Sequence, residues 1–296
     1  MGFSRGTQSV ESEGRKLYMG VGSFFVKGVN LNKKELGEIF GSEREKEPVY
    51  LGERDIPLVG VFPRVRIDFV ISTDPEKNNG IDKTFIVPFF VTKREVRGSQ
   101  SGKIQVIDKY GRTQWVTDAE LATHAIPVSS KTGLPLNIDV DYRPVYDGEE
   151  NLTNFIKAYL NIPDVEKWEN KKVVGLIDNP KDAEARLDDI EKIFNGDFSS
   201  LKEYLTYQPS NKVKLELGVR TTNDNKQYQA FFTEMPLKSS VSNYTRLEKT
   251  INERQASGAY GDTVFEVYDL KEYNNTPTDF SGAATTAAAN PWFNKQ

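Results

Sequence analysis

Cations and aromatic rings gather in one stretch of the sequence, residues 92–115 (TKREVRGSQSGKIQVIDKYGRTQW). The cations are Lys93, Arg94, Arg97, Lys103, Lys109 and Arg112, and the two rings that close the stretch are Tyr110 and Trp115. Cations can follow a phosphate backbone while flat rings stack on bases, which is the chemistry of single-stranded nucleic acid binding. The alternative is a solvated hairpin whose Trp115 belongs to the core. Composition leaves both interpretations open, and Trp115 is the residue that separates them.

A second group of candidate nucleic-acid-binding residues lies near a polar turn later in the chain. Residues 212–220 and 227–233 alternate in polarity and predict two strands joined by the turn TTNDN. Arg220 and Tyr228 stand next to that turn. Lys212 and Lys214 fall on the polar face of the first strand, opposite an apolar face. We expect this hairpin to add cations and a ring to the binding surface.

The sequence lacks the residues that many kinds of catalysis require. The chain has one His, His124, and no Cys, so thiolate catalysis, Cys-based zinc sites and His-rich metal sites are excluded. No phosphate-binding loop, nucleophile elbow or Ser/His/Asp set appears. The pair Asp139 and Asp141 is most simply a solvated strand end. An enzyme would have to work with carboxylates or Lys, and no such set stands out. We therefore expect a protein that is not an enzyme and that uses no cofactor and no metal.

Net charge is −4, but the charge is unevenly distributed. Residues 1–116 carry 19 Lys and Arg against 15 Asp and Glu, whereas residues 139–205 carry 9 against 16. Residues 206–261 are again mildly basic, with 8 against 5. A basic surface on an acidic body can still attract a polyanion, because the local field steers it. The overall charge therefore does not exclude nucleic acid.

The hydrophobic pattern predicts a mainly β protein with helical insertions. Strands are expected at residues 16–30, where glycines indicate bulges or tight curvature, and at 62–71, 84–92, 104–107 and 264–268. Helices are expected at 33–40, between Asn32 and Gly41, at 150–161, and after Asn179 up to Asn195. We predict a flexible arm over 1–16, one domain over 17–269 with a helical insertion at about 150–205, and a flexible tail over 270–296.

The predicted tail is rich in Asn, Thr, Ala and Pro and ends with two large rings, Trp292 and Phe293. Rings at the end of such a segment rarely contribute to a fold, so we expect these two to dock a partner protein. No apolar run approaches the roughly 20 residues needed to cross a bilayer, and the first residues lack the apolar core of a signal peptide. We expect a cytoplasmic protein without membrane contact.

Four stretches resemble a known family. They are KLYMGVGSFFVKGVNLNKKELGEIFG, SGKIQVIDKYGRTQW, YDGEENLTNFIKAYLNI and LELGVRTTNDNKQYQAFF. The chain resembles the single-stranded DNA-binding proteins of tailed phages, particularly those of crAss-like phages of gut Bacteroidetes. In the second stretch Gly102, Lys103, Asp108, Gly111 and Trp115 fall at the family's spacing.

The resemblance implies an OB-type curved β-barrel with an inserted helical segment, which binds single strands without strong sequence preference. It also implies a tail that docks replication and recombination proteins, with possible self-association on DNA. In a virus-encoded protein the compartment would be the host cytoplasm. Two other functions are weighed beside this one: a structural protein of the phage virion, from its capsid or tail, and an RNA-binding module on the same barrel.

Overall fold

The computed structural model describes residues 16–42, 45–57, 60–95, 103–108, 113–117, 142–144, 146–161, 192–207 and 210–273. Within these ranges it describes only the backbone at 94–95, 103–108, 113–117, 142–144, 204 and 206–207. The expected N-terminal arm before Lys16, the helix after Asn179 up to residue 191, and the tail beyond Tyr273 lie outside the described residues.

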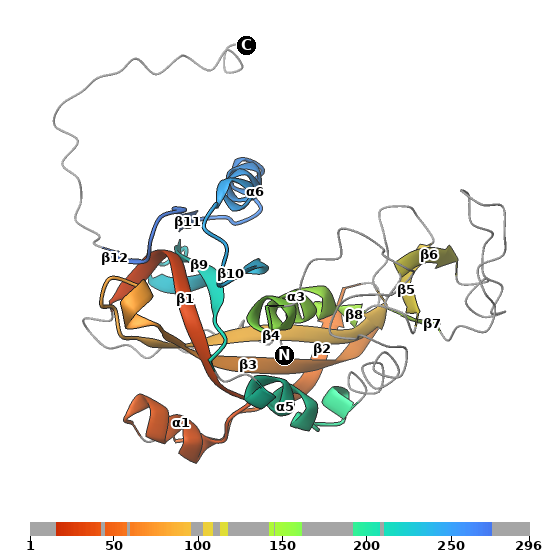
Figure 1. The fold of residues 1–296 in the computed structure, drawn as a ribbon. Helices are drawn as coiled ribbons and strands as arrows, with labels where there is room; N and C mark the ends of the chain where they lie inside the picture. Colours follow the sequence, from red (N-terminus) through yellow and green to blue (C-terminus); the bar gives the residue numbers. More distant parts are fainter. Residues whose placement is uncertain are drawn as a thin grey trace, which may run out of the picture.

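A strongly curled antiparallel sheet dominates the described chain (Figure 1). Its main path runs β10–β9–β1–β3–β4–β8, and three short strands pair beside that path. The path consists of β1 (Leu17–Val29), β3 (Gly60–Thr73), β4 (Thr84–Glu95), β8 (Tyr146–Asp147), β9 (Val213–Thr221) and β10 (Gln227–Lys238). β2 (Leu51–Ile56) pairs with β3, β11 (Thr263–Phe265) with β9, and β12 (Lys271–Tyr273) with β1.

β1 belongs to both halves of the barrel. Its first half pairs with β9 and its second half with β3, so the strand must bend between them. Gly20, with φ of 112°, and a bulge between Val26 and Gly28 provide the curvature that the sequence predicted. The order β10–β9–β1–β3–β4 is the connectivity of a partly open, five-stranded Greek-key barrel of OB type. The predicted fold class, mainly β with helical insertions, is confirmed.

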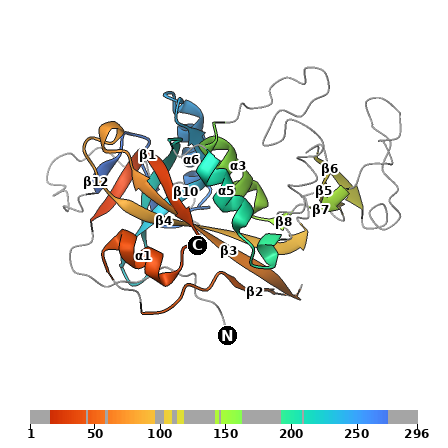
Figure 2. The same cartoon turned by 60° about the horizontal axis from the view of Figure 1, so that its bottom comes forward.

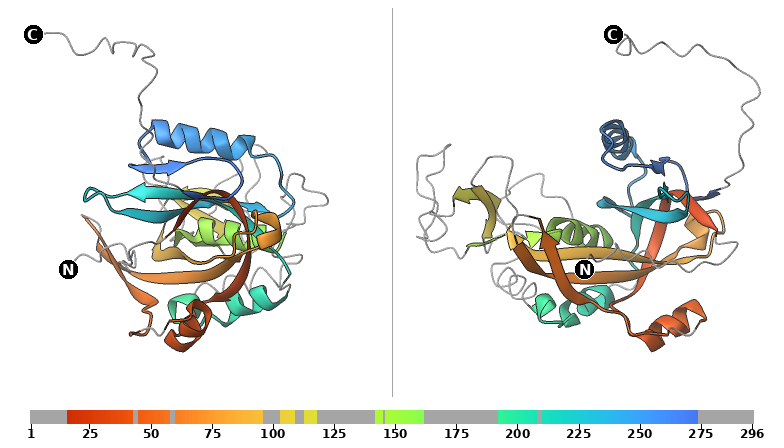
Figure 3. Two further views of the ribbon diagram at one scale, coloured as in Figure 1. Left: turned by 90° about the vertical axis from the view of Figure 1, so that its left-hand side faces the viewer. Right: turned by 180° about the vertical axis from the view of Figure 1, so that it is seen from behind.

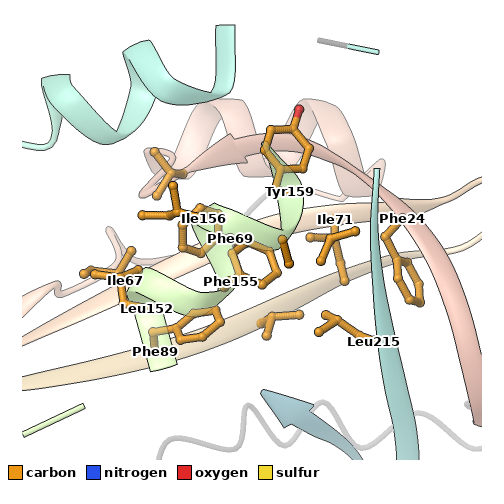
Figure 4. Close-up of a cluster of buried hydrophobic side chains, with 14 of the residues drawn as sticks. Phe24, Ile67, Phe69, Ile71, Phe89, Leu152, Phe155, Ile156, Tyr159 and Leu215 are labelled. Carbon is orange, nitrogen blue, oxygen red and sulfur yellow. The ribbon is translucent and has the colours of Figure 1, made fainter. Parts of the chain in front are cut away.

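The barrel core lies on one face of β3 and β4, here called the inner face. α3 (Glu149–Tyr159) inserts Phe155 into it, with ring centroids 4.6 Å from Phe69 and 5.0 Å from Phe89 (Figure 4). Phe85 of β4 meets Phe231 of β10 edge to face at 5.7 Å, so β4 and β10 come together although three strands separate them in the path. α5 (Ser199–Tyr207) adds the buried Leu201 to this cluster.

α1 (Lys33–Phe40) packs on the opposite face of the sheet, here called the outer face. Its Leu36 forms a small cluster with Val70 of β3, and Ile86 of β4 packs against that cluster. Asn32 and Glu35 form a capping box at its first turn, and Gly41 ends it in the left-handed conformation. The predicted bounds of this helix are therefore confirmed.

The C-terminal part covers the other half of the barrel. α6 (Thr245–Ala256) buries Leu247 and Ile251 against Phe232 of β10 and Phe265 of β11. It lies at the opposite end of the molecule from α1 (Figures 1 and 3). Leu270 is fully buried in the barrel core and β12 pairs with β1, so the folded domain extends to Tyr273, past the predicted boundary at 269.

A smaller sheet of β5 (Lys103–Asp108), β6 (Thr113–Thr117) and β7 (Tyr142–Pro144) lies beyond β8 (Figures 1 and 2). β5 and β6 form the hairpin expected within residues 92–115, with Gln105 opposite Trp115. A single 3-10 turn, η1 (Pro75–Lys77), links β3 to β4. Among the described residues, no helix has the length and apolarity that crossing a membrane requires.

Candidate nucleic-acid interface

The outer face of β2, β3 and β4 combines cations and rings. Because strand side chains alternate, Val65, Ile67 and Phe69 enter the core while Arg64 and Arg66 point to the outer face. Register puts Arg64 opposite Thr92 and Arg66 opposite Phe90 on β4, and Phe62 opposite Arg54 on β2. The residues Arg54, Phe62, Arg64, Arg66 and Phe90 are named the β3–β4 cluster below.

Arg64 and Phe90 stack within this cluster. The guanidinium carbon of Arg64 lies 3.9 Å from the centroid of the Phe90 ring, within the range of a cation–π contact. Both side chains are half-buried, so each keeps part of its surface in solvent. A guanidinium over a ring presents a charge for phosphate and planar groups for a base at the same place.

Arg66 is held by its neighbours. Its Nε donates to Oδ1 of Asp68 at 2.6 Å, and Asp68 is buried. Burial raises the pKa of Asp68, and the hydrogen bond and charge of Arg66 act against that rise. Asn30 joins the same group, because its side chain accepts from the Asp68 amide and donates to the Arg66 carbonyl. Arg66 therefore stabilises this part of β3, and its charge is largely neutralised.

Arg54 pairs with Asp147 of β8 on the same face. Nη1 of Arg54 lies 3.2 Å from Oδ2 of Asp147, and the two side chains are 44% and 39% exposed. Asp147 stands opposite Thr92, which stands opposite Arg64, so the ion pair lies over the strands that carry Arg64 and Phe90. Exposed pairs of this kind contribute little to stability. A phosphate can therefore replace Asp147 as the partner of Arg54 at small cost.

The residues predicted within 92–115 fall partly inside the described chain. Lys93 lies at the end of β4, half-buried, with Nζ 5.7 Å from the Phe194 ring centroid. Arg94 lies in β4, Lys103 in β5 and Trp115 in β6, where the backbone is described. The remaining predicted nucleic-acid and partner-binding residues lie outside the described residues: Arg97, Lys109, Tyr110, Arg112, Trp292 and Phe293.

Arg220 and Tyr228 are directly paired across β9 and β10, as the predicted hairpin requires. Arg220 is exposed and Tyr228 is half-buried. β4 and β9 run in opposite directions in the strand path, so Lys93 and Arg220, each near the C-terminal end of its strand, lie toward opposite ends of the sheet. Of the two predicted groups, the described residues Lys93 and Arg220 therefore lie apart.

The two lysines expected to be available on the polar face of the predicted strand over 212–220 are engaged instead. Lys212 pairs with Oδ2 of the buried Asp74 at 2.5 Å. Lys214 donates to the carbonyl of Val241 at 2.6 Å and lies 3.2 Å from the Tyr244 hydroxyl. The expectation that this face offers two lysines is corrected for this reason: the β3–β4 turn and the segment before α6 supply their partners.

The β3–β4 cluster was missing from the prediction, although the sequence contains one signal for it. In PRVRID two arginines alternate with apolar residues, which places both on one face of a strand. Their closeness to Phe90 depends on the register between β3 and β4, which the sequence does not reveal. Arg54 gives no such signal, because β2 lacks alternation.

The comparisons with known proteins identify no relative. No family model matches the chain, and neither the curated proteins nor the solved structures contain a match. Within the described ranges, no group of three or more His, Cys, Asp and Glu side chains is placed to hold a metal ion.

Proposed function

We propose that this protein binds single-stranded DNA without strong sequence preference, through the β3–β4 cluster and the basic stretch that continues from β4. The observation that carries the proposal is the stack of Arg64 on Phe90 at 3.9 Å. This stack lies on the outer face of the second and third strands of an OB-type barrel, the face on which such barrels hold oligonucleotides. The proposed role is binding, without catalysis.

The chemistry of the face supports a sequence-tolerant contact. An arginine that contacts phosphate and a phenylalanine that stacks on a base recognise features shared by all nucleotides, and in these contacts neither side chain reads a base edge. A role in phage DNA replication and recombination, with proteins recruited by Trp292 and Phe293, rests on the family resemblance of the sequence. The same resemblance supports placing the protein in the host cytoplasm.

The test is fluorescence anisotropy with labelled oligo-dT. Arg64→Ala and Phe90→Ala should each weaken binding by about 5- to 150-fold, the range for losing a stacked base. Tyr268→Ala is the matched control, because Tyr268 is 63% exposed and carries Lys271 at 5.2 Å from its ring, but lies outside the cluster. Equal affinities for all three variants, each shown to be folded, would refute the assignment of the face.

Competition separates the alternatives. Excess unlabelled DNA should displace the probe more effectively than RNA of the same length. Preference for RNA would instead support an RNA-binding module on the same barrel. Absence of binding to either nucleic acid, even at low salt, would favour a structural protein of the virion.

A further inference from the structure

A second ring flanked by cations lies on the same face of the sheet, on β1. The Phe25 ring centroid is 4.8 Å from Nζ of Lys212 and 5.5 Å from Nζ of Lys27. Phe25 stands opposite Ser72 of β3, and Ser72 shares the outer face with Arg64 because the two are an even number of residues apart. The arrangement therefore repeats the combination of ring and cation found at Phe90.

Phe25 is held firmly but is not a core residue. It is half-buried and belongs to none of the clusters of buried side chains in the described chain, whereas its neighbour Phe24 is fully buried. Lys212 is fixed by its ion pair with Asp74, of which 6% of the side chain is exposed. Lys27 is exposed, and no ion pair to it is found among the described side chains. One cation thus positions the ring while the other remains available to an anion.

The backbone of β1 is also fixed two residues before Phe25. The Ser23 amide donates to Oδ1 of Asn78 at 2.9 Å, and Nδ2 of Asn78 donates to the Ser23 carbonyl at 2.7 Å. Asn78 is itself buried. A ring on a rigid strand loses little conformational entropy when a base stacks on it, which favours binding.

From this geometry we propose that Phe25 and Lys27 form a second stacking site for the single strand that binds at Arg64 and Phe90, an inference that rests on the proposed function. Ser72 and Arg64 are eight residues apart on β3, so the two sites are separated by about 26 Å. At the stacked spacing of about 3.4 Å per nucleotide, a stacked strand needs about eight nucleotides to reach both, and a more extended strand needs fewer. That length lies within the range of roughly 4–16 nucleotides per OB fold. α1 packs between the two sites over Val70, so the strand must pass beside this helix.

The inference predicts a dependence on oligonucleotide length. Binding of fluorescent oligo-dT of about 4 and about 20 nucleotides is measured for the wild type and for Phe25→Ala/Lys27→Ala, and the quantity compared is the gain in affinity from the short to the long oligomer. The gain should fall by about 5- to 150-fold in the double variant, while the short oligomer still binds at Arg64 and Phe90.

Phe25→Leu separates stacking from packing, because leucine keeps apolar contact with the strand but has no aromatic face. It should lower the gain with the long oligomer while leaving the urea midpoint close to that of the wild type. If both variants keep the wild-type gain in affinity, the second site is overturned and the proposed function still stands. The contact of Phe25 with Lys212 would then only connect β1 to Asp74. Failure of the wild type to bind either oligomer would overturn the proposed function and this inference with it.

Discussion

The free energy of unfolding should decrease as the pH rises, and replacing Glu216 with Gln should remove most of this decrease. Glu216 lies on β9 with 1% of its surface exposed, and neither carboxylate oxygen makes a hydrogen bond of good geometry. Burial raises its pKa to about 8, against the partial opposition of the Gly20 and Glu266 amides, and the charge of Glu266 raises it further. The buried carboxyl is therefore protonated at neutral pH.

The magnitude follows from linkage. The unfolded chain releases this proton near pH 4.5, whereas the folded protein keeps it up to about pH 8. Between these values the folded state binds a proton that the unfolded state lacks, so the free energy of unfolding decreases as the pH rises. Each pH unit corresponds to about 1.4 kcal/mol, which gives a loss of about 3 kcal/mol by pH 7 and of between about 4 and 5 kcal/mol above pH 8.

Urea unfolding followed by circular dichroism at pH 5, 6, 7 and 8 measures this effect. Glu216→Gln should exceed the wild type by less than about 1 kcal/mol at pH 5 and by about 3 kcal/mol at pH 7, because the amide has no proton to release. Glu53→Gln, at an exposed position of β2, is the control and should follow the wild-type curve. A difference between Glu216→Gln and wild type that stays constant from pH 5 to 8 would show that Glu216 does not bind the proton assigned to it.

Three further predictions follow from the fold and the site. Phe155→Ala should lower the free energy of unfolding by about 3–5 kcal/mol, because it empties the centre of the barrel core; a loss below about 1 kcal/mol in urea would contradict this packing. Gly148→Ala should destabilise by about 1–3 kcal/mol or more, since φ is 84° there and an added Cβ meets the Phe90 carbonyl oxygen; an unchanged thermal midpoint would refute the reasoning. In a variant that retains Trp115 as its only tryptophan, with Trp168 and Trp292 changed to Phe, oligo-dT should quench the fluorescence if Trp115 stacks on bases; an unchanged spectrum would remove Trp115 from the site.

The elements that the sequence predicted are those that carry their own local signal. Alternation in 62–71 and 84–92 marks β3 and β4, and Asn32 and Gly41 delimit α1 by their capping chemistry. β2 was missed because LGERDI has no alternation; its pairing with β3 makes it a strand. α6 was missed because its buried face consists of little more than Leu247 and Ile251.

The candidate site also has a part that the sequence could predict and a part that it could not. A run of cations within one segment is visible as composition, so residues 92–115 could be proposed without a structure. Arg64 and Phe90 lie on different strands, and their contact depends on a register that puts Arg66 opposite Phe90. Phe25 and Lys212 are farther apart still, and β1 and β9 bring them together. Contacts between distant strands are determined by the packing of the whole barrel, which no local sequence pattern indicates.

The most direct test of the central claim is the salt dependence of oligo-dT binding by the wild type and by Arg54→Ala/Arg64→Ala. Each arginine that neutralises a phosphate contributes roughly 0.7 to the slope of log K against log salt for a single strand. We expect tight binding at low salt, a steep decline with added salt, and a slope that is shallower by about 1.4 in the double variant. Oligo-dT binding that is absent at low salt, or a slope that the double variant leaves unchanged, would contradict it.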